Sequence, residues 1–412
     1  MISRREFLAT TARSASAAAG AALAPASALA LGAPRSRRGL VDWMAGDGDD
    51  FLRTAPRARY WTTTALAGSN CTACHKGQPD PARAHPHDPA SVRCLLCAQQ
   101  CDIPAGKSGQ CRARMNVKGV LRSLVYGRPA STHVDPIEKK PFYHFLPGSA
   151  ALSFGTSGCP LRCKFCQNWE LSQSTPGDLE APFTSAAQMA RAAESRRTPV
   201  IAFTYNEPTV FTEYLLDVAA EARTRGVRSV MVSCGFANEA PMADICRSLS
   251  AVKIDLKGFS EEFYRTVCGA ELQPVLRSIK QVARSGRHLE IVNLVVPTLN
   301  DSEKSLQGLA SWVTGELGPD VPVHFTRFHP DYQLLNLPPT PVSTLERARD
   351  IAMAAGIRYA YIGNVPGHAG NHTYCPGCRK VIVRRESFFV TEIHMKGGAC
   401  AFCKRPIAGV WS

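Results

Sequence analysis

The sequence has no long, strongly apolar run, and it has fewer acidic than basic residues. The alanine-rich stretch 15–31 is too weakly hydrophobic for a stable membrane span, and no other stretch is long and apolar enough. The 48 Lys and Arg residues outnumber the 34 Asp and Glu residues, giving a formal net charge of +14. Such an excess suits a nucleic-acid partner, but no basic run with interleaved aromatic residues accompanies it. We therefore expect neither a stable membrane span nor a nucleic-acid partner.

The first thirty residues have the pattern of a twin-arginine targeting signal. Residues 3–8 read Ser-Arg-Arg-Glu-Phe-Leu, and an alanine-rich run leads to a candidate cleavage site, Ala-Leu-Ala, at residues 28–30. Because this route exports folded, cofactor-loaded proteins, the signal predicts a periplasmic protein. A fortuitous basic N-terminus would instead leave the protein in the cytoplasm. Residues 31–70 are expected to form a linker.

Cysteine, in contrast, is abundant. The chain has 16 cysteines, and all but three of them fall into closely spaced groups. In a chain of 412 residues, such groups indicate metal ligation more than a disulfide framework. Cys234, Cys246 and Cys268 stand alone, and we expect Cys246 and Cys268 to be small, buried hydrophobic residues.

Short apolar runs alternate with helical patterns from residue 151 onwards, which is typical of βα units and a parallel sheet. Six or seven units are too few for a complete eight-stranded barrel. We therefore expect an α/β protein with a partial (β/α)6 barrel of the TIM type over residues 151–370. A cysteine-rich region, 71–150, should precede this barrel, and a zinc-ribbon-like module, 371–412, should follow it. The predicted strands are 152–155, 199–205, 229–233, 251–256, 289–296, 321–328 and 358–362.

Three cysteines directly follow the first predicted strand: Cys159, Cys163 and Cys166. Three thiolates this close together can bind three irons of a [4Fe–4S] cluster and leave the fourth iron without a protein ligand. An open metal position is typical of a catalytic site rather than a structural one. A zinc loop or three buried thiols would be the alternative. The spacing and the position after a strand favour the open cluster.

This C-x3-C-x2-C spacing, with the aromatic Phe165 before the last cysteine, resembles the signature of radical S-adenosylmethionine (SAM) enzymes. The resemblance implies the same partial barrel. It also implies that the open iron chelates the amino and carboxylate groups of SAM. An electron from the cluster would then cleave SAM to a 5′-deoxyadenosyl radical, which abstracts hydrogen from a substrate.

Further motifs are similar to those of the radical enzyme of the AmmeMemoRadiSam system, a group related to the pyruvate formate-lyase activating enzymes. The resemblance covers about residues 92–412. The motifs are Asp-Pro-Ile-Glu-Lys-Lys-Pro at 135–141, Thr-Tyr-Asn-Glu-Pro-Thr at 204–209, Val-Lys-Ile-Asp-Leu-Lys-Gly at 252–258, His-Pro-Asp-Tyr at 329–332, Gly-Asn-Val-Pro-Gly at 363–367 and Gly-Val-Trp at 409–411.

The resemblance assigns cofactor contacts to individual residues of these motifs. Glu207 would support the methionine amino group of SAM, and the neighbouring Asn206 stands where the activating enzymes have a glycine. Asp255 and Lys257 would lie at the SAM-binding or activation site, although a buried Asp–Lys pair is also a common structural ion pair. Cys234 stands where relatives tend to have Asn-Gly and is expected to face the pocket.

Three residues on or just after the sixth predicted strand are further candidates: His324, Arg327 and His329. They could anchor a carboxylate or peptide substrate. A structural role, with every hydrogen bond satisfied within the protein, is the alternative for each.

Two four-cysteine sets flank the predicted barrel. Near the C-terminus, Cys375, Cys378, Cys400 and Cys403 have zinc-ribbon spacing, and a closed four-thiolate tetrahedron is structural. An electron-transfer cluster is the alternative there. Before the barrel stand Cys94, Cys97, Cys101 and Cys111, which the resemblance places within the family fold. Soft thiolates suit both zinc and an auxiliary iron–sulfur cluster, and we favour zinc slightly.

A further motif, Cys71-Thr-Ala-Cys74-His75, lies ahead of the region that the resemblance covers. In an exported protein, C-x-x-C-H is typical of covalent attachment of a c-type haem, with His75 as the proximal ligand. In a competing interpretation, Cys71 and Cys74 form a metal ribbon with Cys94 and Cys97. Free thiols or a disulfide are the third possibility.

Together these features predict a radical SAM enzyme, an activating-enzyme-like oxidoreductase. Its partners would be an electron donor and an unknown protein or small-molecule substrate. The alternative function is an exported multi-centre iron–sulfur and haem electron-transfer protein without SAM chemistry. The motifs at 204–209 and 252–258 favour the enzyme, because electron transfer alone would not need them.

Overall fold

The structure is a computed structural model that describes residue 52 and the segments 55–63 and 90–412. The targeting signal and the candidate haem motif with Cys71, Cys74 and His75 lie outside these residues and stay predictions. None of the helices within the described segments combines the length and the apolar character needed to cross a membrane.

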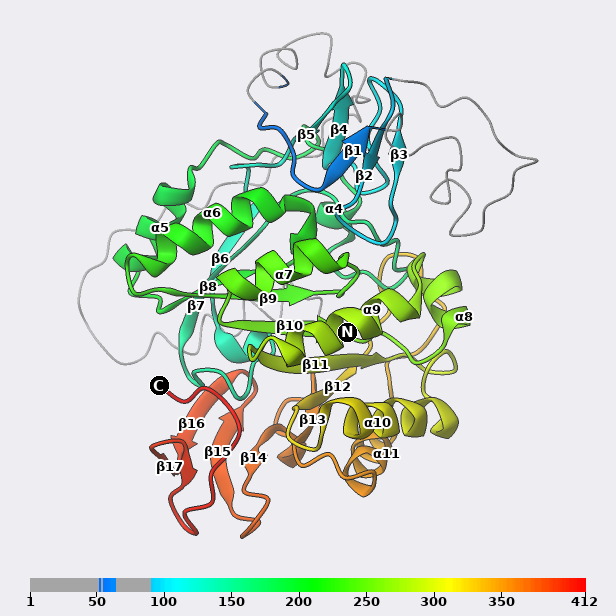
Figure 1. The fold of residues 1–412 in the computed structure, drawn as a ribbon. Coiled ribbons are helices and arrows are strands. Elements are labelled where there is room, and N and C mark those ends of the chain that lie inside the picture. Colours follow the sequence, from blue (N-terminus) through cyan, green and yellow to red (C-terminus); the bar gives the residue numbers. More distant parts are fainter. Residues whose placement is uncertain (1–51, 53–54, 64–89) are drawn as a thin grey trace. The chain divides into compact units, whose positions relative to one another are not determined.

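An eight-stranded mixed sheet forms the centre of the fold (Figure 1). The strand order is β13-β12-β11-β10-β9-β8-β7-β6, with β6 antiparallel to β7 and every other neighbouring pair parallel. The strands are β6 Ser131–Pro136, β7 Ala150–Gly155, β8 Val200–Phe203, β9 Arg228–Ser233, β10 Ala251–Asp255, β11 His288–Val295, β12 Val323–Arg327 and β13 Ala360–Gly363.

The seven predicted strands correspond to β7–β13, and their parallel arrangement is confirmed. The antiparallel edge strand β6 was not predicted. Its burial pattern shows why, because only Asp135 is buried along it and the apolar Val134 is exposed. The closure of the sheet into a partial barrel stays a prediction.

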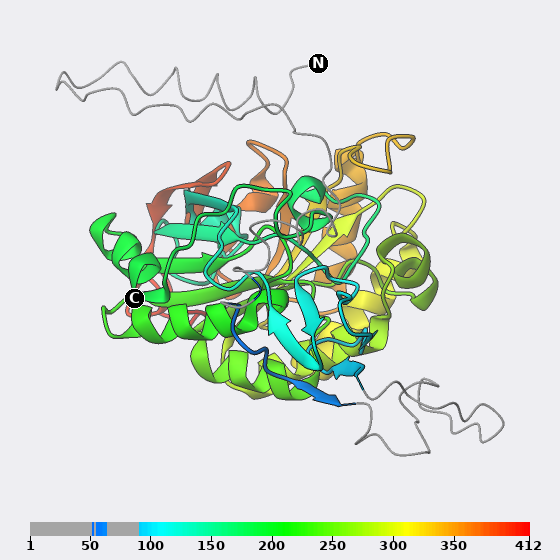
Figure 2. The same ribbon diagram turned by 90° about the horizontal axis from the view of Figure 1, so that it is seen from above.

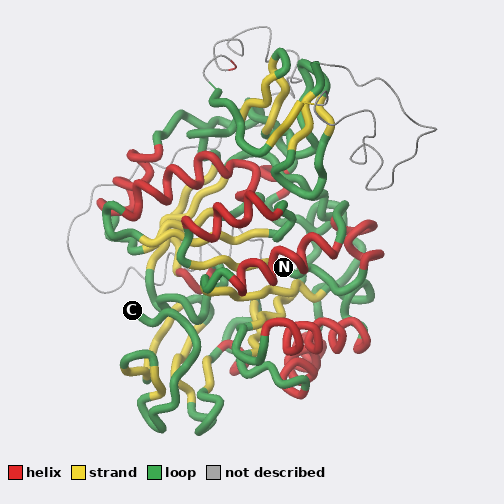
Figure 3. The backbone as a smooth tube through the Cα atoms, viewed as in Figure 1, coloured by secondary structure: helices red, strands yellow, loops and turns green. Residues whose placement is uncertain are grey.

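Helices connect the parallel strands and pack against one another in chain order, forming a continuous layer (Figure 3). The helix α9 illustrates why they form, because its apolar residues recur every three or four positions and are buried against the sheet. The α-helices are α4 Trp169–Ser172, α5 Ala186–Ser195, α6 Thr212–Arg223, α7 Glu239–Ser248, α8 Glu261–Phe263, α9 Leu272–Arg284, α10 Glu303–Leu317 and α11 Val342–Ala354. The shorter 3-10 and π turns are η3 Ile137–Lys139, η4 Pro208–Phe211, η5 Tyr264–Cys268 and η6 Ala369–Asn371.

The region before the sheet packs at the carboxyl ends of the parallel strands (Figures 1 and 2). It contains the antiparallel sheet of β1 Trp61–Thr63, β2 Val92–Cys94 and β3 Asp102–Ile103, and the hairpin of β4 Arg114–Val117 and β5 Val120–Ser123. The backbone N–H of Ala98 donates to the carbonyl of Phe236 (3.0 Å), and that of Asn238 donates to Leu96 (3.1 Å). Residues 236–238 follow β9, so these bonds fix the region at that end.

The C-terminal residues pack at the opposite, amino ends of the strands. They form the sheet of β14 Thr373–Tyr374, β15 Val381–Glu386 and β16 Phe389–Ile393, and the hairpin of β17 Met395–Lys396 and β18 Ala399–Cys400. The backbone N–H groups of Leu146 and Val410 donate to Val410 and His144, both at 2.7 Å. Arg228, the first residue of β9, donates to the carbonyl of Ser412 at 2.9 Å.

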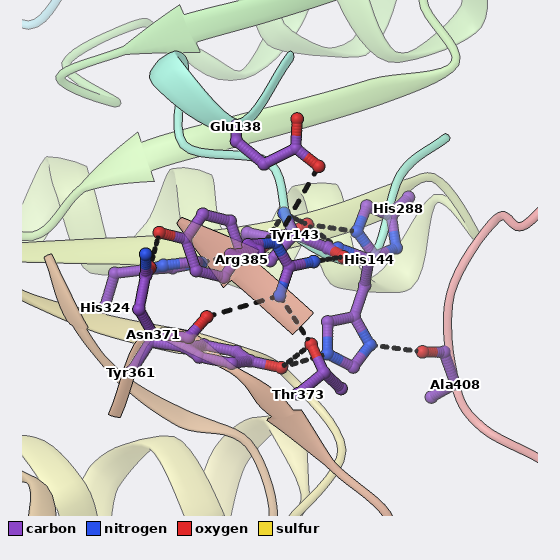
Figure 4. Close-up of polar contacts among 11 residues, drawn as sticks. Glu138, Tyr143, His144, His288, His324, Tyr361, Asn371, Thr373, Arg385 and Ala408 are labelled. Atoms are coloured by element: carbon purple, nitrogen blue, oxygen red, sulfur yellow. Dashed lines mark hydrogen bonds and ion pairs between the residues drawn. The ribbon is translucent and has the colours of Figure 1, made fainter. Parts of the chain in front are cut away.

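A buried polar network joins this C-terminal module to the sheet (Figure 4). Its centre is Glu290 on β11, whose fully buried carboxylate accepts hydrogen bonds from the backbone N–H groups of Tyr143 and His144 and from the rings of His288 and His324. Burial alone would raise the pKa of Glu290, but the two histidines hold it well below its usual value.

Arg385 on β15 extends the same network from the C-terminal module. Its guanidinium donates to the Tyr143 carbonyl and to the Thr373 hydroxyl, both at 2.8 Å, and lies 3.7 Å from the carboxylate of Glu138. Arg385 and Glu138 are both fully buried. The network therefore ties the C-terminal module to the sheet through charged groups that water does not reach.

Candidate functional site

The three cysteines of the C-x3-C-x2-C motif lie on the loop that joins β7 to α4. β7 ends at Gly155, where a side chain would clash because a Cβ there would lie 2.4 Å from the carbonyl oxygen of Thr204. Asn206 holds the beginning of the loop. Its side chain accepts from the Thr156 N–H (3.2 Å) and donates to the carbonyl of Gly158 (2.7 Å). The cysteine loop is therefore fixed to the end of β8.

Two other segments hold the middle of the loop. The backbone N–H groups of Arg162 and Lys164 donate to the carbonyls of Cys268 (2.9 Å) and Val267 (3.0 Å), which belong to η5. The second segment is the motif at 329–332, whose Tyr332 stacks on Trp169 with the ring centroids 5.3 Å apart. The loop is thus held on several sides, as a site for a bound cofactor requires.

The three thiols lie near one another in a largely buried part of the loop. Cys163 is 8% exposed, and Cys159 and Cys166 are half-buried. Burial raises the pKa of Cys159, and Glu207 and the other two thiols raise it further. Burial and Cys163 likewise raise the pKa of Cys166. A bound metal centre would stabilise the thiolate forms of Cys159 and Cys166, which are costly to ionise without one.

The spacing of these thiols differs from that of a mononuclear metal site. A single metal ion needs ligand atoms that lie close together. Within the described segments, the C-terminal cysteines form such a set, because their sulfurs all lie within 4.8 Å of one another. Cys159, Cys163 and Cys166 are described but do not form such a set. Three separated thiolates fit a cluster in which each of them binds a different iron.

Glu207 lies beside this loop at the end of β8 and is 3% exposed. Its Oε1 accepts from the Thr209 N–H (3.1 Å) and the Ser233 hydroxyl (2.8 Å), and its Oε2 accepts from the backbone N–H of Cys234 (2.6 Å). These bonds place the carboxylate between β8 and β9. Because a carboxylate has about four lone-pair sites, Oε2 keeps acceptor capacity for a further donor.

Asp255 and Lys257 lie at the end of β10. The carboxylate of Asp255 binds the ammonium of Lys253 and, at 3.2 Å, that of Lys257. Burial would raise the pKa of Asp255, but the two lysines lower it to about 2. The Lys257 ammonium also lies 5.7 Å from the ring centroid of Phe165 in the cysteine loop. The ion pair therefore holds a cation beside the three thiols.

Two isolated cysteines also reach this site. Cys234 is buried, and Glu207 and Cys159 add to the effect of burial in raising the pKa of its thiol, so it does lie beside the cysteine loop. Cys268 is fully buried as expected, but it is more than a hydrophobic residue because its side chain lowers the pKa of Cys163. No sequence signal predicted this contact, since Cys268 follows a different strand.

The candidate substrate anchors on β12 do not come together at the cysteine loop. His324 is 1% exposed and hydrogen-bonds to Glu290 at 2.7 Å in the network of Figure 4, so the structural alternative holds for it. The guanidinium of Arg327 donates to the carbonyl of Thr340 at 2.8 Å. His329 is exposed.

The two four-cysteine sets lie at opposite ends of the sheet. Cys94, Cys97, Cys101 and Cys111 line one small cavity near the carboxyl ends of the strands. The four cysteines of the predicted set therefore lie together, and a ribbon with Cys71 and Cys74 stays untested because those two residues lie outside the described segments.

In the C-terminal module, the four sulfurs are close together. The Sγ atoms of Cys375 and Cys403 are 3.5 Å apart, and those of Cys378 and Cys400 are 3.7 Å apart. The predicted four-cysteine cluster is therefore confirmed in this module, although its metal and its ribbon fold stay predictions.

The chain is similar to several known proteins. The family model described as "Radical SAM superfamily" matches residues 154–309. An uncharacterized protein of Methanocaldococcus jannaschii is 39% identical over 322 residues, which are 78% of this chain and 96% of that protein. The isethionate sulfite-lyase activating enzyme of Desulfovibrio desulfuricans is 27% identical over 109 residues, 26% of this chain and 35% of that enzyme. A solved domain of a pyruvate-formate lyase-activating enzyme from Bacteroides vulgatus is 19% identical, covers 40% of this chain and 98% of that domain, and has a TM-score of 0.36.

Proposed function

Because this chain belongs to the radical SAM superfamily, we propose that Cys159, Cys163 and Cys166 hold a [4Fe–4S] cluster whose fourth iron binds SAM. The observation that carries the proposal is the convergence of these three thiols with Glu207 and Lys257 at the carboxyl ends of the strands. When bound, the cluster would supply the electron that cleaves SAM to the 5′-deoxyadenosyl radical.

The protein's own groups fit the two charged ends of SAM. Glu207 would accept a hydrogen bond from the methionine ammonium through Oε2, which also accepts from the backbone N–H of Cys234. Its other bonds, to Thr209 and Ser233, hold the carboxylate in place before SAM arrives. Such preorganisation lowers the entropic cost of positioning the cofactor.

Lys257, held by Asp255, would balance the negative charge of the thiolates and of the SAM carboxylate. The Lys257 ammonium, held by Asp255 at 3.2 Å, lies against Phe165 of the cysteine loop. A fixed cation there stabilises the anionic thiolates and any carboxylate brought to the open iron. Asn206 has a different role, because both ends of its amide already hold the loop at Thr156 and Gly158.

We propose that the radical abstracts hydrogen from a protein or small-molecule substrate, in the manner of an activating enzyme of the AmmeMemoRadiSam group. The motifs at 135–141, 204–209 and 252–258 support this subfamily. The reaction needs a one-electron donor as a partner. The twin-arginine pattern at residues 3–8 supports a periplasmic location for the mature enzyme.

We further propose that Cys375, Cys378, Cys400 and Cys403 bind a structural zinc ion. A tetrahedral site with Zn–S bonds of about 2.3 Å has sulfurs about 3.8 Å apart. The observed separations of 3.5 and 3.7 Å are close to this value. Four protein ligands leave no open position, so the ion would stabilise the module rather than take part in the reaction.

The proposed function can be tested by SAM cleavage. The chain is reconstituted anaerobically with iron and sulfide and reduced with dithionite, and 5′-deoxyadenosine is then measured. We expect the wild type to form it and Cys163→Ala to form none. Cys246→Ala is the matched control, because Cys246 is equally buried but lies on α7, in none of the cysteine groups.

Two results would contradict the proposal. Cleavage of SAM by Cys163→Ala would show that this loop does not hold the reacting cluster. A wild type that binds the cluster but never cleaves SAM would instead indicate the electron-transfer protein without SAM chemistry.

A further inference from the structure

We propose that Cys94, Cys97, Cys101 and Cys111 hold a second [4Fe–4S] cluster, with all four irons bound by protein thiolates. The sequence slightly favoured zinc for these residues, because four thiolates suit either metal. Three features of the structure argue for the cluster: the arrangement of the thiols, the space between them, and a buried cation that faces this space.

The four thiols surround one cavity. Cys94 ends β2, Cys97 and Cys101 lie on the segment between β2 and β3, and Cys111 lies shortly before β4. All four line the same small cavity. Burial raises the pKa of Cys97, and the thiols of Cys94, Cys111 and Cys101 raise it further. The sulfurs therefore point into a shared space and not into separate parts of the core.

The sulfurs of these four cysteines are too far apart for a single zinc ion. A tetrahedral zinc site requires sulfurs about 3.8 Å apart, and the C-terminal set meets this requirement. Cys94, Cys97, Cys101 and Cys111 all lie within the described segments but are not a set whose donor atoms lie within 4.8 Å of one another. Thiolates around a cavity fit a polynuclear cluster, because each of them then binds a different iron.

Arg114 supplies the buried cation. Its side chain is fully buried and lines the cavity. One nitrogen, Nη2, pairs with Glu213 and donates to the carbonyl of Arg59 (3.2 Å). The other two, Nε and Nη1, are buried without a hydrogen-bond partner.

Buried donors without partners cost free energy, and Nε and Nη1 of Arg114 therefore need acceptors beyond the carboxylate of Glu213. The sulfurs of a four-thiolate cluster would supply these acceptors. A four-thiolate zinc ion would also satisfy Arg114, so the spacing of the thiols, and not the charge, decides between the two metals.

Backbone donors point at the sulfurs as well. The N–H of Gln110 lies 3.5 Å from Sγ of Cys101. The N–H groups of Gln99 and Ala113 oppose the effect of burial on the pKa of Cys97 and Cys111. Hydrogen bonds to the sulfurs are one of the means by which proteins set the reduction potential of an iron–sulfur cluster.

The position of this site suggests its role, and this step rests on the proposed function. The side-chain amides of Gln99 and Gln110 both donate to the carbonyl of Pro160 at 3.1 Å, and Pro160 itself lines the cavity. Pro160 directly follows Cys159 of the radical SAM loop. A second cluster here would be separated from the first by this shared wall, and without an open iron it would pass single electrons from an external donor to the first cluster.

The test uses the full chain in a Cys71→Ser/Cys74→Ser background, so that the motif at 71–75 binds no metal. Iron, sulfide and zinc are measured after anaerobic reconstitution, and electron paramagnetic resonance spectra are recorded after reduction with and without SAM. One variant lacks the radical SAM thiols (Cys159→Ala/Cys163→Ala/Cys166→Ala). A second carries Cys97→Ser/Cys101→Ser. Cys246→Ser is the matched control.

We expect about eight irons per chain in the background protein and about four in each cysteine variant, because each cluster holds four. The signal of the triple-alanine variant should not respond to SAM, whereas that of the Cys97→Ser/Cys101→Ser variant should. The control should match the background protein. Because the triple-alanine variant leaves the second site intact, it remains informative even if Cys97→Ser/Cys101→Ser fails to fold.

The proposal is overturned if the triple-alanine variant retains no iron. Zinc that disappears with Cys97→Ser/Cys101→Ser would identify the site as a zinc site. Neither result would affect the proposed function, which depends on SAM cleavage by the first cluster. Conversely, iron that stays in the triple-alanine variant of a protein that never cleaves SAM would support the second cluster alone.

Discussion

The two four-cysteine sets have the same ligands but differ in almost everything else. In the C-terminal module the sulfurs are 3.5 and 3.7 Å apart in two pairs, with no room between them for more than one ion. Near the N-terminus the sulfurs surround a cavity, and the buried Arg114 faces it. The identity of the ligands therefore does not select the metal. We expect the distances that the surrounding fold imposes on the sulfurs to select it.

The two sets are also coupled to different parts of the sheet. The N-terminal set adjoins the radical SAM loop, where a Cβ on Gly158 would lie 2.3 Å from the carbonyl oxygen of Cys111. The C-terminal module is joined to the amino ends of the strands through Glu290 and Arg385. Damage to the first set should therefore alter redox chemistry, and damage to the second should alter stability. Four predictions test this contrast.

The largest effect is expected for Cys400→Ser in the C-terminal set. Cys400 is fully buried, and binding of a structural zinc ion contributes on the order of 10 kcal/mol to the folding of small modules. Zinc content should fall by one ion, and residues 375–412 should become sensitive to proteases. Iron content and the response of the cluster to SAM should not change. A protease-resistant module without zinc would show that the four thiols do not hold it together.

The next largest effect is expected for Glu290→Gln. This change replaces a buried carboxylate by a neutral amide. The carboxylate accepts hydrogen bonds from four groups, two backbone N–H groups and the rings of His288 and His324. Hydrogen bonds to a buried charge contribute about 1.5–3 kcal/mol each, so the loss of two or more of them should clearly lower the midpoint of denaturant unfolding.

The control for Glu290→Gln is Glu392→Gln, an exposed carboxylate that also pairs with a histidine and an arginine. Exposed pairs contribute little to stability, because water screens them. An equal loss of stability in both variants would show that burial of the network is unimportant.

Gly158→Ala tests the contact between the two N-terminal cysteine groups. Gly158 has a φ of +92°, and its added Cβ would clash with the carbonyl of Cys111. Together, the clash and the unfavourable φ should cost about 3 kcal/mol and lower the iron content of both cluster sites. Gly106→Ala is the matched control, because Gly106 also has a positive φ (+74°) but has no atom within 4 Å of its Cβ position. If both variants retain iron equally, the two sites are not coupled here.

The smallest effect is a pH dependence from Glu138. Burial raises its pKa from 4.5 to about 6, although Arg385 opposes the shift, and its Oε2 has no hydrogen-bond partner. The folded state binds the proton of the Glu138 carboxyl group more tightly than the unfolded state does. This proton therefore stabilises the fold fully below pH 4.5, and the stabilisation is lost as the pH rises through about 6. The loss is about 2 kcal/mol. Glu138→Gln should remove this part of the pH dependence when unfolding is followed from pH 4.5 to 7. If the difference in unfolding free energy between the wild type and Glu138→Gln stays the same across this range, the pH dependence does not come from Glu138.

The central elements were predictable because their signals are local. Alternating apolar runs and helical patterns gave the seven parallel strands, and parallel strands bring the ends of β7, β8 and β10 to one edge of the sheet. This topology brings Glu207 and Lys257, which the family resemblance assigned to the site, to the same edge as Cys159. The edge strand β6 escaped prediction because it lacks the apolar pattern of the others.

The sequence by itself determined the groups of ligands: a three-cysteine loop after a strand and two sets of four cysteines, with the charged residues that follow neighbouring strands. Only the tertiary structure decided how far apart the four sulfurs of each set lie, that Cys268 reaches Cys163, and that His324 belongs to a buried network with Glu290. The physical reason is that spacing along a chain limits which residues can share a metal. The distances between their sulfurs, and the charges buried beside them, depend on packing between segments that are remote in sequence.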